Sequence, residues 1–270
     1  MFTPIFEKDE PDTYNGDMRL REVDLHIRSI LDIDGMAAID RSLNGVQVGD
    51  LDGEVGRAAF AVDAALETIR RAAEWGADLL FVHHGLFWGS DVPITGDHYN
   101  RIKLLLDDGV ALYAAHLPLD KHAELGNNAQ MAAALGLDSV APFGEYKGTT
   151  IGVQGTLPTP TGIESLAATL FGSPDAPIAM LPFGPEANQT VAIVSGGAPH
   201  QVDEAIAAGV DCYVTGDASH VIYHRCLEAG INVIFGGHYL TETWGPQAMM
   251  RRLQSDIRLE TTFIDLPTGL

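Results

Sequence analysis

The sequence predicts an α/β protein with two lobes, each built on layers of helices and a largely parallel, mixed sheet. Two observations favour this fold class. Short apolar runs rich in β-forming residues alternate with segments of helical composition. Several of those helical segments end in glycine, the residue that most readily adopts the left-handed conformation at a helix end. Strands that alternate with helices are typical of a parallel sheet covered by helices.

The elements follow in order along the chain. An amphipathic helix is predicted over residues 19–32, where Leu20, Val23 and Ile27 recur at helical spacing. The predicted strands are 58–62, 78–82, 110–115, 150–154, 190–195, 212–216, 232–236 and 260–264. The predicted helices are 64–75, 97–108, 123–135, 199–208, 217–229 and 246–254. Two stretches rich in proline and glycine, 155–162 and 172–187, flank one further short helical run.

Charge and composition exclude several classes of function. The chain has 270 residues, 46% of them hydrophobic, which is enough for an ordinary core. Its 37 acidic residues outnumber 16 basic ones and give a net charge of -21. General nucleic-acid binding is not expected, because phosphate contacts rely on clustered Lys and Arg. The acidic residues are spread along the whole chain, which favours a uniformly hydrated surface and a salt-adapted, halophilic protein.

The same composition predicts a cytoplasmic protein without membrane contact. No run approaches the roughly 20 apolar residues that span a bilayer. Residues 1–17 contain no basic region followed by an apolar stretch, so no leader is expected. Cys212 and Cys226 have no CxxC partner, and they are predicted to be buried thiols outside any disulfide or zinc knuckle.

Metal-binding side chains follow three of the predicted strands. His83 and His84 come after 78–82, Asp120 follows 110–115, and His238 and Glu242 follow 232–236. Ligands of α/β proteins bind beyond the carboxyl ends of strands, where these side chains are expected to meet. Five donors are too many for one tetrahedral zinc and suit two ions bridged by a carboxylate, with Glu242 preferred as the bridge and Asp120 second. Mixed imidazole and carboxylate ligands suit zinc, iron or manganese.

Structural roles remain open for each of these residues. A single histidine at a strand end is more often structural than metal-binding, and Asp120 could cap the following helix. Glu242 could be a solvated helix residue. Pro246 cannot donate to the carbonyl of Glu242, so the His238–Glu242 spacing need not lie on a regular helix.

Other patterns are less specific. Residues 196–198 (GGA) form a strand-to-helix turn that serves either tight packing or phosphate binding, without a full GxGxxG pattern. His220 and His224 are four residues apart near Asp217, where they either face the same cleft or are exposed structural histidines. No GxSxG motif for nucleophilic hydrolysis is present.

An ordered series of motifs resembles the NIF-three-like proteins, also described as GTP cyclohydrolase I type 2 homologues. The resemblance covers residues 18–268, and residues 1–17 match none of its motifs. The motifs are 42–49 (SLNGVQVG), 83–88 (HHGLFW), 116–120 (HLPLD), 195–198 (SGGA), 215–217 (TGD), 237–242 (GHYLTE) and 263–267 (FIDLP).

The resemblance implies a NIF-three-like fold. Lobe 1 would comprise 18–117 and 241–270, lobe 2 would comprise 118–240, and the site would lie between them. It implies two divalent ions per subunit and a toroidal homo-hexamer whose sites face the interior. The family ligands, carried over position by position, are His83, His84, Asp120, His238 and Glu242.

The implied function is metal-dependent hydrolysis of a nucleotide. In the cyclohydrolase reaction, water attacks C8 of the guanine ring of GTP, formate leaves and dihydroneopterin triphosphate forms. His122 or His224 is a candidate proton carrier, and the metal ions would offset the triphosphate charge. The alternatives are a non-catalytic metal-binding or chaperone-like assembly protein, and a phosphoesterase.

Overall fold

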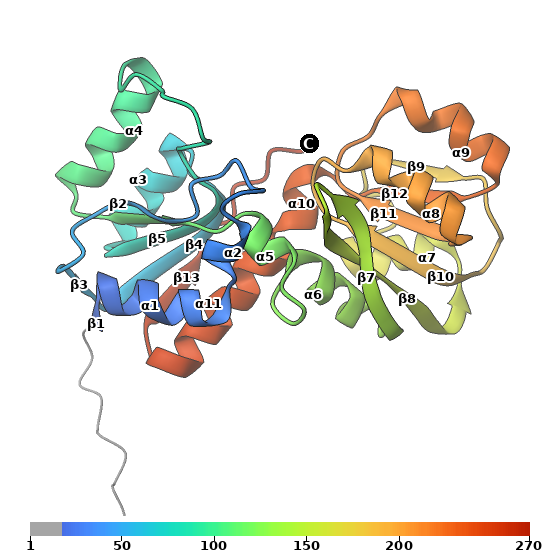
Figure 1. The fold of residues 1–270 in the computed structure, drawn as a ribbon, viewed down its shortest axis with the longest axis horizontal. Coiled ribbons are helices and arrows are strands. Elements are labelled where there is room, and N and C mark those ends of the chain that lie inside the picture. The colour runs from blue at the N-terminus through green and yellow to red at the C-terminus, as the bar shows by residue number, and fades with distance from the viewer. Residues whose placement is uncertain (1–17) are drawn as a thin grey trace, which may run out of the picture.

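A computed structural model describes residues 18–270, whose two large sheets are joined by a short set of helices (Figure 1). A third sheet consists of two short strands only. The prediction that no leader is present falls on residues 1–17, outside the described part. The two-lobed α/β prediction is confirmed, because each large sheet has helices on both faces. Among the described residues, no helix is both long and apolar enough to cross a membrane.

The first sheet has five strands in the order β13-β4-β5-β6-β2. Their bounds are β13 Glu260–Phe263, β4 Arg57–Asp63, β5 Leu79–His84, β6 Ala111–Ala114 and β2 Gly45–Val48. Every pairing is parallel except that of β2 with β6. The carboxyl ends of β4, β5 and β6 therefore meet at one edge, beside the helices that join the two sheets.

Helices cover both faces of the first sheet, and alternate residues of each strand face opposite sets of helices. Phe60 and Phe81 face α1 (Leu20–Ile30) and α11 (Trp244–Ile257), with which they form one core cluster. Their neighbours Ala61 and Val82 face α3 (Leu66–Trp75) and α4 (Gly96–Asp107) in another. Burial on both faces explains why these strands are continuous apolar runs in the sequence.

The second sheet has six strands in the order β7-β8-β10-β11-β12-β9. Their bounds are β7 Asp138–Tyr146, β8 Thr149–Thr161, β10 Asn188–Val194, β11 Cys212–Thr215, β12 Asn232–Phe235 and β9 Ala179–Pro182. Only the central strands β10, β11 and β12 are parallel, so this sheet is mixed rather than largely parallel. The strands β2, β7 and β9 were not predicted, and all three lie at sheet edges.

Core clusters also lie on both faces of the second sheet. On one face are α8 (Val202–Ala208), preceded by the turn η1 (Pro199–Gln201), and α9 (Tyr223–Ala229), preceded by η2 (His220–Ile222). On the other face lie α6 (Asn127–Ala134) and α7 (Ile163–Phe171). Cys212 and Cys226 are buried free thiols in these clusters, as predicted.

The chain crosses between the two sheets twice. The first crossing contains α5 (Leu117–Asp120) and α6, and the second contains α10 (His238–Glu242) and α11. Pro246 lies in the first turn of α11, where a missing backbone N–H breaks no helical hydrogen bond. The lobe boundaries at residues 117/118 and 240/241 remain predictions. The short elements β1 (Met18–Arg19), β3 (Glu54–Val55) and α2 (Ile33–Met36) complete the first half.

Candidate metal centre

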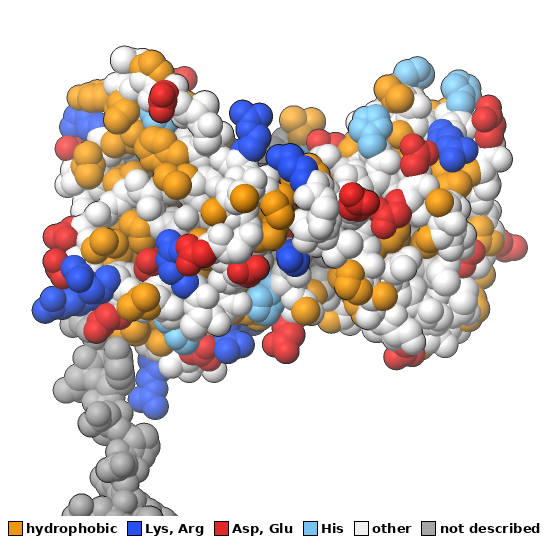
Figure 2. Space-filling model, in the orientation of Figure 1, with side chains coloured by type: hydrophobic (Ala, Val, Ile, Leu, Met, Phe, Trp, Pro, Cys, Tyr) orange, Lys and Arg blue, Asp and Glu red, His pale blue; other side chains and the backbone are white. Residues whose placement is uncertain are grey.

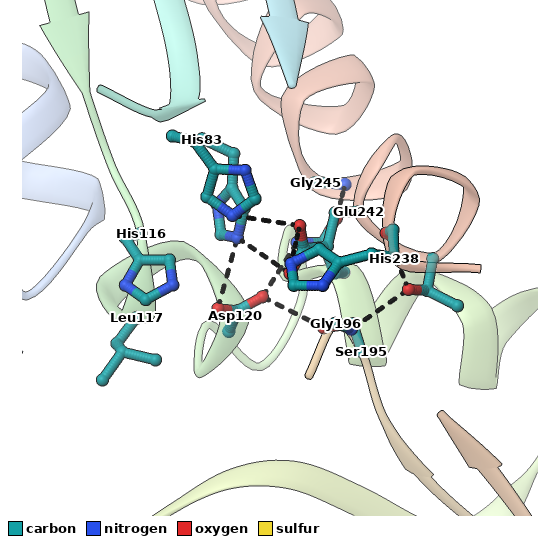
Figure 3. Close-up of polar contacts among 12 residues, drawn as sticks. His83, His116, Leu117, Asp120, Ser195, Gly196, His238, Glu242 and Gly245 are labelled. Carbon is teal, nitrogen blue, oxygen red and sulfur yellow. Dashed lines mark hydrogen bonds and ion pairs between the residues drawn. The ribbon is translucent and has the colours of Figure 1, made fainter. Parts of the chain in front are cut away.

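The two crossings and the end of β5 bring the five predicted donors together. His83 and His84 end β5, Asp120 ends α5, and His238 and Glu242 lie one turn apart on α10. Figure 3 shows the carboxylates of Asp120 and Glu242 among the imidazoles of His83 and His238. Residues from distant parts of the sequence thus form one cluster at the junction of the two sheets.

The donors fall into two groups that share Glu242. The inner group is His83, Asp120 and Glu242, all buried. The outer group is His84, His238 and Glu242, and its histidine side chains are 18% and 35% exposed. In each group, one potential ligand atom per residue lies within 4.8 Å of the others, as a shared metal ion requires.

Glu242 lies at the centre of these contacts. Its Oε1 is 3.5 Å from Nε2 of His83, and its Oε2 is 3.1 Å from Nε2 of His84 and 3.2 Å from Nε2 of His238. Nε2 of His83 is also 3.4 Å from Oδ2 of Asp120. One carboxylate with two groups of imidazoles around its two oxygens is the arrangement expected of a bridging ligand.

Two of these buried atoms have no hydrogen-bonding partner among the described residues. They are Nε2 of His83 and Oε2 of Glu242, which lie at ion-pair distance from their neighbours without the geometry of a hydrogen bond. Unpartnered buried polar atoms are costly in a folded protein. A cation between the two groups would provide the missing partner, so the residues present fit divalent metal ions.

Each histidine is oriented through its other ring nitrogen. Nδ1–H of His83 donates to the carbonyl of Ala115 at 2.9 Å, and this leaves Nε2 as a lone-pair donor. Nδ1–H of His84 donates to Asp63 at 2.8 Å, and Nδ1–H of His238 donates to Asp217 at 2.9 Å. Such hydrogen bonds are typical of metal-binding histidines, whose tautomer and ring orientation they fix.

Asp120 is held as a ligand would be, and it does not cap a helix. Its Oδ1 accepts hydrogen bonds from the side chains of Asn127 at 2.8 Å and Ser195 at 3.1 Å, which leaves Oδ2 directed toward His83. Asn127 in turn accepts the backbone N–H of Gly245 at 2.6 Å. This amide therefore links Asp120 to the first turn of α11.

The cluster shifts the pKa values of its own members. Burial acts most strongly on His83 and lowers its pKa, but Asp120 and Glu242 together raise it above the usual value. In the same way the carboxylates overcome burial and raise the pKa of His84 to about 10 and of His238 to about 9. Burial raises the pKa of Glu242, yet the histidines bring it well below its usual value. Without metal, the raised pKa values of His84 and His238 keep these two imidazoles protonated at neutral pH.

Gly196 provides the space that Glu242 occupies. Its φ is +65°, a left-handed conformation that favours glycine, and an added Cβ would overlap Oε1 of Glu242. Its carbonyl accepts N–H groups from Gly216 and Asp217 at 3.0 Å each. The close approach of Glu242 accounts for the glycine at this turn, so tight packing explains the 196–198 motif.

His116 also lies beside the cluster, although its sequence context did not predict a ligand. It forms a third potential group with His83 and His84, and its Nδ1–H donates to Asp40 at 2.9 Å. Burial raises the pKa of Asp40, but hydrogen bonds from His116 and Asn44 help to bring it down to about 2. His116 and Asp120 are four positions apart in the sequence, as are His238 and Glu242, and that spacing could have identified His116.

The two predicted proton carriers lie in none of these groups. Nδ1 of His122 accepts the backbone N–H groups of Glu124 at 3.1 Å and Leu125 at 3.0 Å, so this ring organises a turn. His224 is exposed on α9, where its ring contacts Tyr223. His220 is exposed as well. Among the described contacts none joins His122 or His224 to the cluster, and their catalytic role stays a prediction.

A cavity of about 260 Å³ opens onto the donors. His116, Asp120, His238 and Glu242 form its polar side. Its other walls include Tyr146, Ile151 and Val194 from the second sheet and Gln201 from the turn η1. A small molecule in this cavity would therefore contact the candidate metal ligands directly.

A layered α/β chain with a buried imidazole–carboxylate cluster at the ends of parallel strands is a candidate metal-binding protein. The chain belongs to the Duf34/NIF3 (NGG1p interacting factor 3) family, whose model matches residues 18–268. That match confirms the resemblance seen in the motifs.

Relatives and solved structures agree with this assignment. The chain is 49% identical to the GTP cyclohydrolase 1 type 2 homolog of Halobacterium salinarum, over 86% of this chain and 92% of the relative. It is 41% identical to the homolog of Treponema pallidum, over 94% of this chain and all of the relative. The crystal structure of TTHA1606 from Thermus thermophilus has a TM-score of 0.85 and 37% identity, over 94% of this chain and all of that one.

Proposed function

We propose that the protein binds two divalent metal ions bridged by Glu242. The observation that supports this most directly is the pair of three-residue groups that share that carboxylate. The inner ion would be held by His83 and Asp120, and the outer ion by His84 and His238. His116 forms a further group with His83 and His84, one residue from each set. Imidazole with carboxylate favours zinc, iron or manganese over calcium or magnesium.

The bound ions would support hydrolysis of a nucleotide, in the manner of a GTP cyclohydrolase. Several relatives carry the name GTP cyclohydrolase 1 type 2 homolog, and the 260 Å³ cavity meets the candidate ligands. When bound, two divalent ions lower the pKa of water and polarise the group under attack. Glu242 and Asp120 would position the ions, while Tyr146 and Gln201 face the space where a heterocycle can lie.

Product identity tests this proposal. The protein, reconstituted with zinc, manganese or iron, is incubated with GTP, and formate, the pterin product and inorganic phosphate are measured separately. Formate together with a pterin product supports ring opening. Release of inorganic phosphate without formate would instead identify the reaction as phosphoester hydrolysis. The control is Glu242→Gln, which should form neither product.

The burial of the inner group favours a second candidate function, metal retention without catalysis. His83 is fully inaccessible, and the side chain of Glu242 is 4% exposed, so an ion there would exchange slowly. A protein that keeps its ions through dialysis but forms no product from a panel of nucleotides would be a metal-binding or chaperone-like assembly protein.

We also propose a cytoplasmic homo-hexamer adapted to high salt. Exposed apolar side chains such as Val221 and Leu106 suit subunit contacts, and Figure 2 shows hydrophobic and acidic side chains on the visible face of both halves. The net charge of -21 and the relative from Halobacterium salinarum favour salt adaptation. Light scattering in molar KCl should give about six times 28.9 kDa. The melting temperature should rise with KCl, and an unchanged value would exclude salt adaptation.

A further inference from the structure

A second cavity lies beside the outer group. It has a volume of about 310 Å³, and its walls include Asp63, His84, Trp88 and Arg101. His84 therefore borders this cavity while its Nε2 faces Glu242. Trp88 is held in place by its indole N–H, which donates to the carbonyl of Gly85 at 3.0 Å. A ligand in this space would contact His84, one of the three outer donors.

Arg101 is an unusual residue in this wall. Within residues 18–270 it makes no ion pair, no hydrogen bond and no cation–π contact, and its Nε is inaccessible to solvent without a partner. Acidic residues outnumber basic ones 37 to 16 in this chain, and arginines such as Arg28 and Arg57 are paired with carboxylates. An inaccessible Nε–H without an acceptor is costly, while the two terminal amino groups remain accessible to a ligand in the cavity.

The surroundings of Arg101 suit an oxyanion. The cavity is also lined by Ala64 and Ala65 at the start of α3, whose first turn has no side-chain cap, so its N–H groups add positive potential. Asp63 also lies in the wall of this cavity, where its carboxylate already accepts the N–H of His84. The planar fork of a guanidinium matches two oxygens of a phosphate group.

We propose that Arg101 binds a phosphate group of the substrate while another part of the same molecule reaches the metal ions. This inference rests on the proposed function for the identity of the substrate as a nucleotide. Arg101 would be a specificity residue, because it would distinguish a phosphorylated substrate from the corresponding nucleoside or free base. The outer metal position and Arg101 would then lie on one continuous path along His84.

The test uses the metal-loaded full chain and inorganic phosphate as the probe, with binding measured by calorimetry. Wild-type protein should bind phosphate saturably, and Arg101→Gln should weaken that binding by roughly 10- to 100-fold, as expected for loss of hydrogen bonds to a charged group. Arg101→Lys should recover part of the affinity, since it restores the charge but not the fork. Metal content and circular dichroism should match the wild type in both variants.

Arg251→Gln is the control for loss of one positive charge, because Arg251 lines a separate cavity beside Trp244. It should bind phosphate as the wild type does. No saturable phosphate binding by the wild type, or equal affinity in Arg101→Gln, would overturn the inference. Arg101-dependent phosphate binding without turnover of any nucleotide would support the anion site and reject the proposed hydrolase. Equal rates of nucleotide hydrolysis in the wild type and Arg101→Gln would support the proposed hydrolase and reject the phosphate site at Arg101.

Discussion

The inner and outer groups share Glu242 but differ in their contact with solvent. His83 is fully buried and lines neither cavity, whereas His84 and His238 border cavities and take their orienting hydrogen bonds from the half-exposed carboxylates Asp63 and Asp217. Burial strengthens electrostatic attraction and excludes water. One cluster of side chains can therefore hold one ion firmly and present another to substrate.

The largest expected effect comes from the shared residue. Glu242→Gln keeps the volume but removes a buried negative charge, and breaking such a set of charges costs about 3–5 kcal/mol. Both ions should bind at least about 100-fold more weakly while the fold persists. Elemental analysis after dialysis, with circular dichroism, measures this at high salt. The exposed His220→Ala is the control, and it should keep its metal.

Retention of two ions with wild-type affinity in Glu242→Gln would contradict the shared-ligand arrangement. The bridge would then have to be Asp120 or solvent.

A smaller effect should separate the two groups. Asp120→Asn retains an oxygen that can accept from Asn127 and Ser195, but it removes the negative charge near His83. The inner ion should be lost and the outer ion kept, so that the stoichiometry falls from two to one. Titration with a chromogenic zinc competitor counts the sites. Loss of both ions would show that the outer group does not bind metal by itself.

The orienting carboxylates should matter less than the ligands. Asp217→Asn removes the charge that orients His238, and changes of this kind typically weaken metal binding about 10- to 100-fold. The effect should be confined to the outer ion. Asp203→Asn is the matched control, because Asp203 pairs with Arg225 on the surface. Equal loss of affinity in the two variants would mean that net charge, and not the orientation of His238, sets the affinity for the outer ion.

The last prediction concerns the pH dependence of metal binding and stability, with no substitution. The metal-free cluster raises the pKa of His84 to about 10 and of His238 to about 9, so an entering ion must displace protons. Outer-site affinity should increase about tenfold per pH unit for each proton released, between pH 6 and 9.

Raised pKa values stabilise the metal-free fold below about pH 6.5, and this stability is lost as the pH rises toward 9–10. Melting temperatures and metal affinities across this range measure both trends.

The sequence predicted the central strands of both sheets. It also predicted that five donors would meet, and these five lie together in the structure. These features have local causes: apolar runs mark buried strands, and polar side chains follow where such strands end. The edge strands β7 and β9 were missed because they contain Pro142 and Pro182, residues that argue against a central strand but are tolerated at an edge.

The contacts of His122 and Gly196 could not be derived from the sequence, and the spacing of His116 from Asp120 makes it a candidate ligand without fixing its contacts. His116 and His122 flank the same Asp120, yet the first ring lies beside the cluster and the second accepts hydrogen bonds in a turn. That difference depends on where the backbone goes after α5. The requirement for Gly196 arises only when α10 brings Glu242 against it, and these residues are far apart in the sequence.

Each passage of the chain between the sheets includes a helix that ends in a donor, Asp120 in α5 and Glu242 in α10. Asn127 joins Asp120 to the first turn of α11, which follows α10. Metal affinity and the relative position of the sheets are therefore thermodynamically linked, because a rotation of one sheet would separate the donors. By reciprocity, any partner that binds both sheets and favours one relative position changes metal affinity by the same factor as the metal changes partner affinity. A metal ion bound in the cluster would therefore make metal affinity sensitive to the relative position of the two sheets.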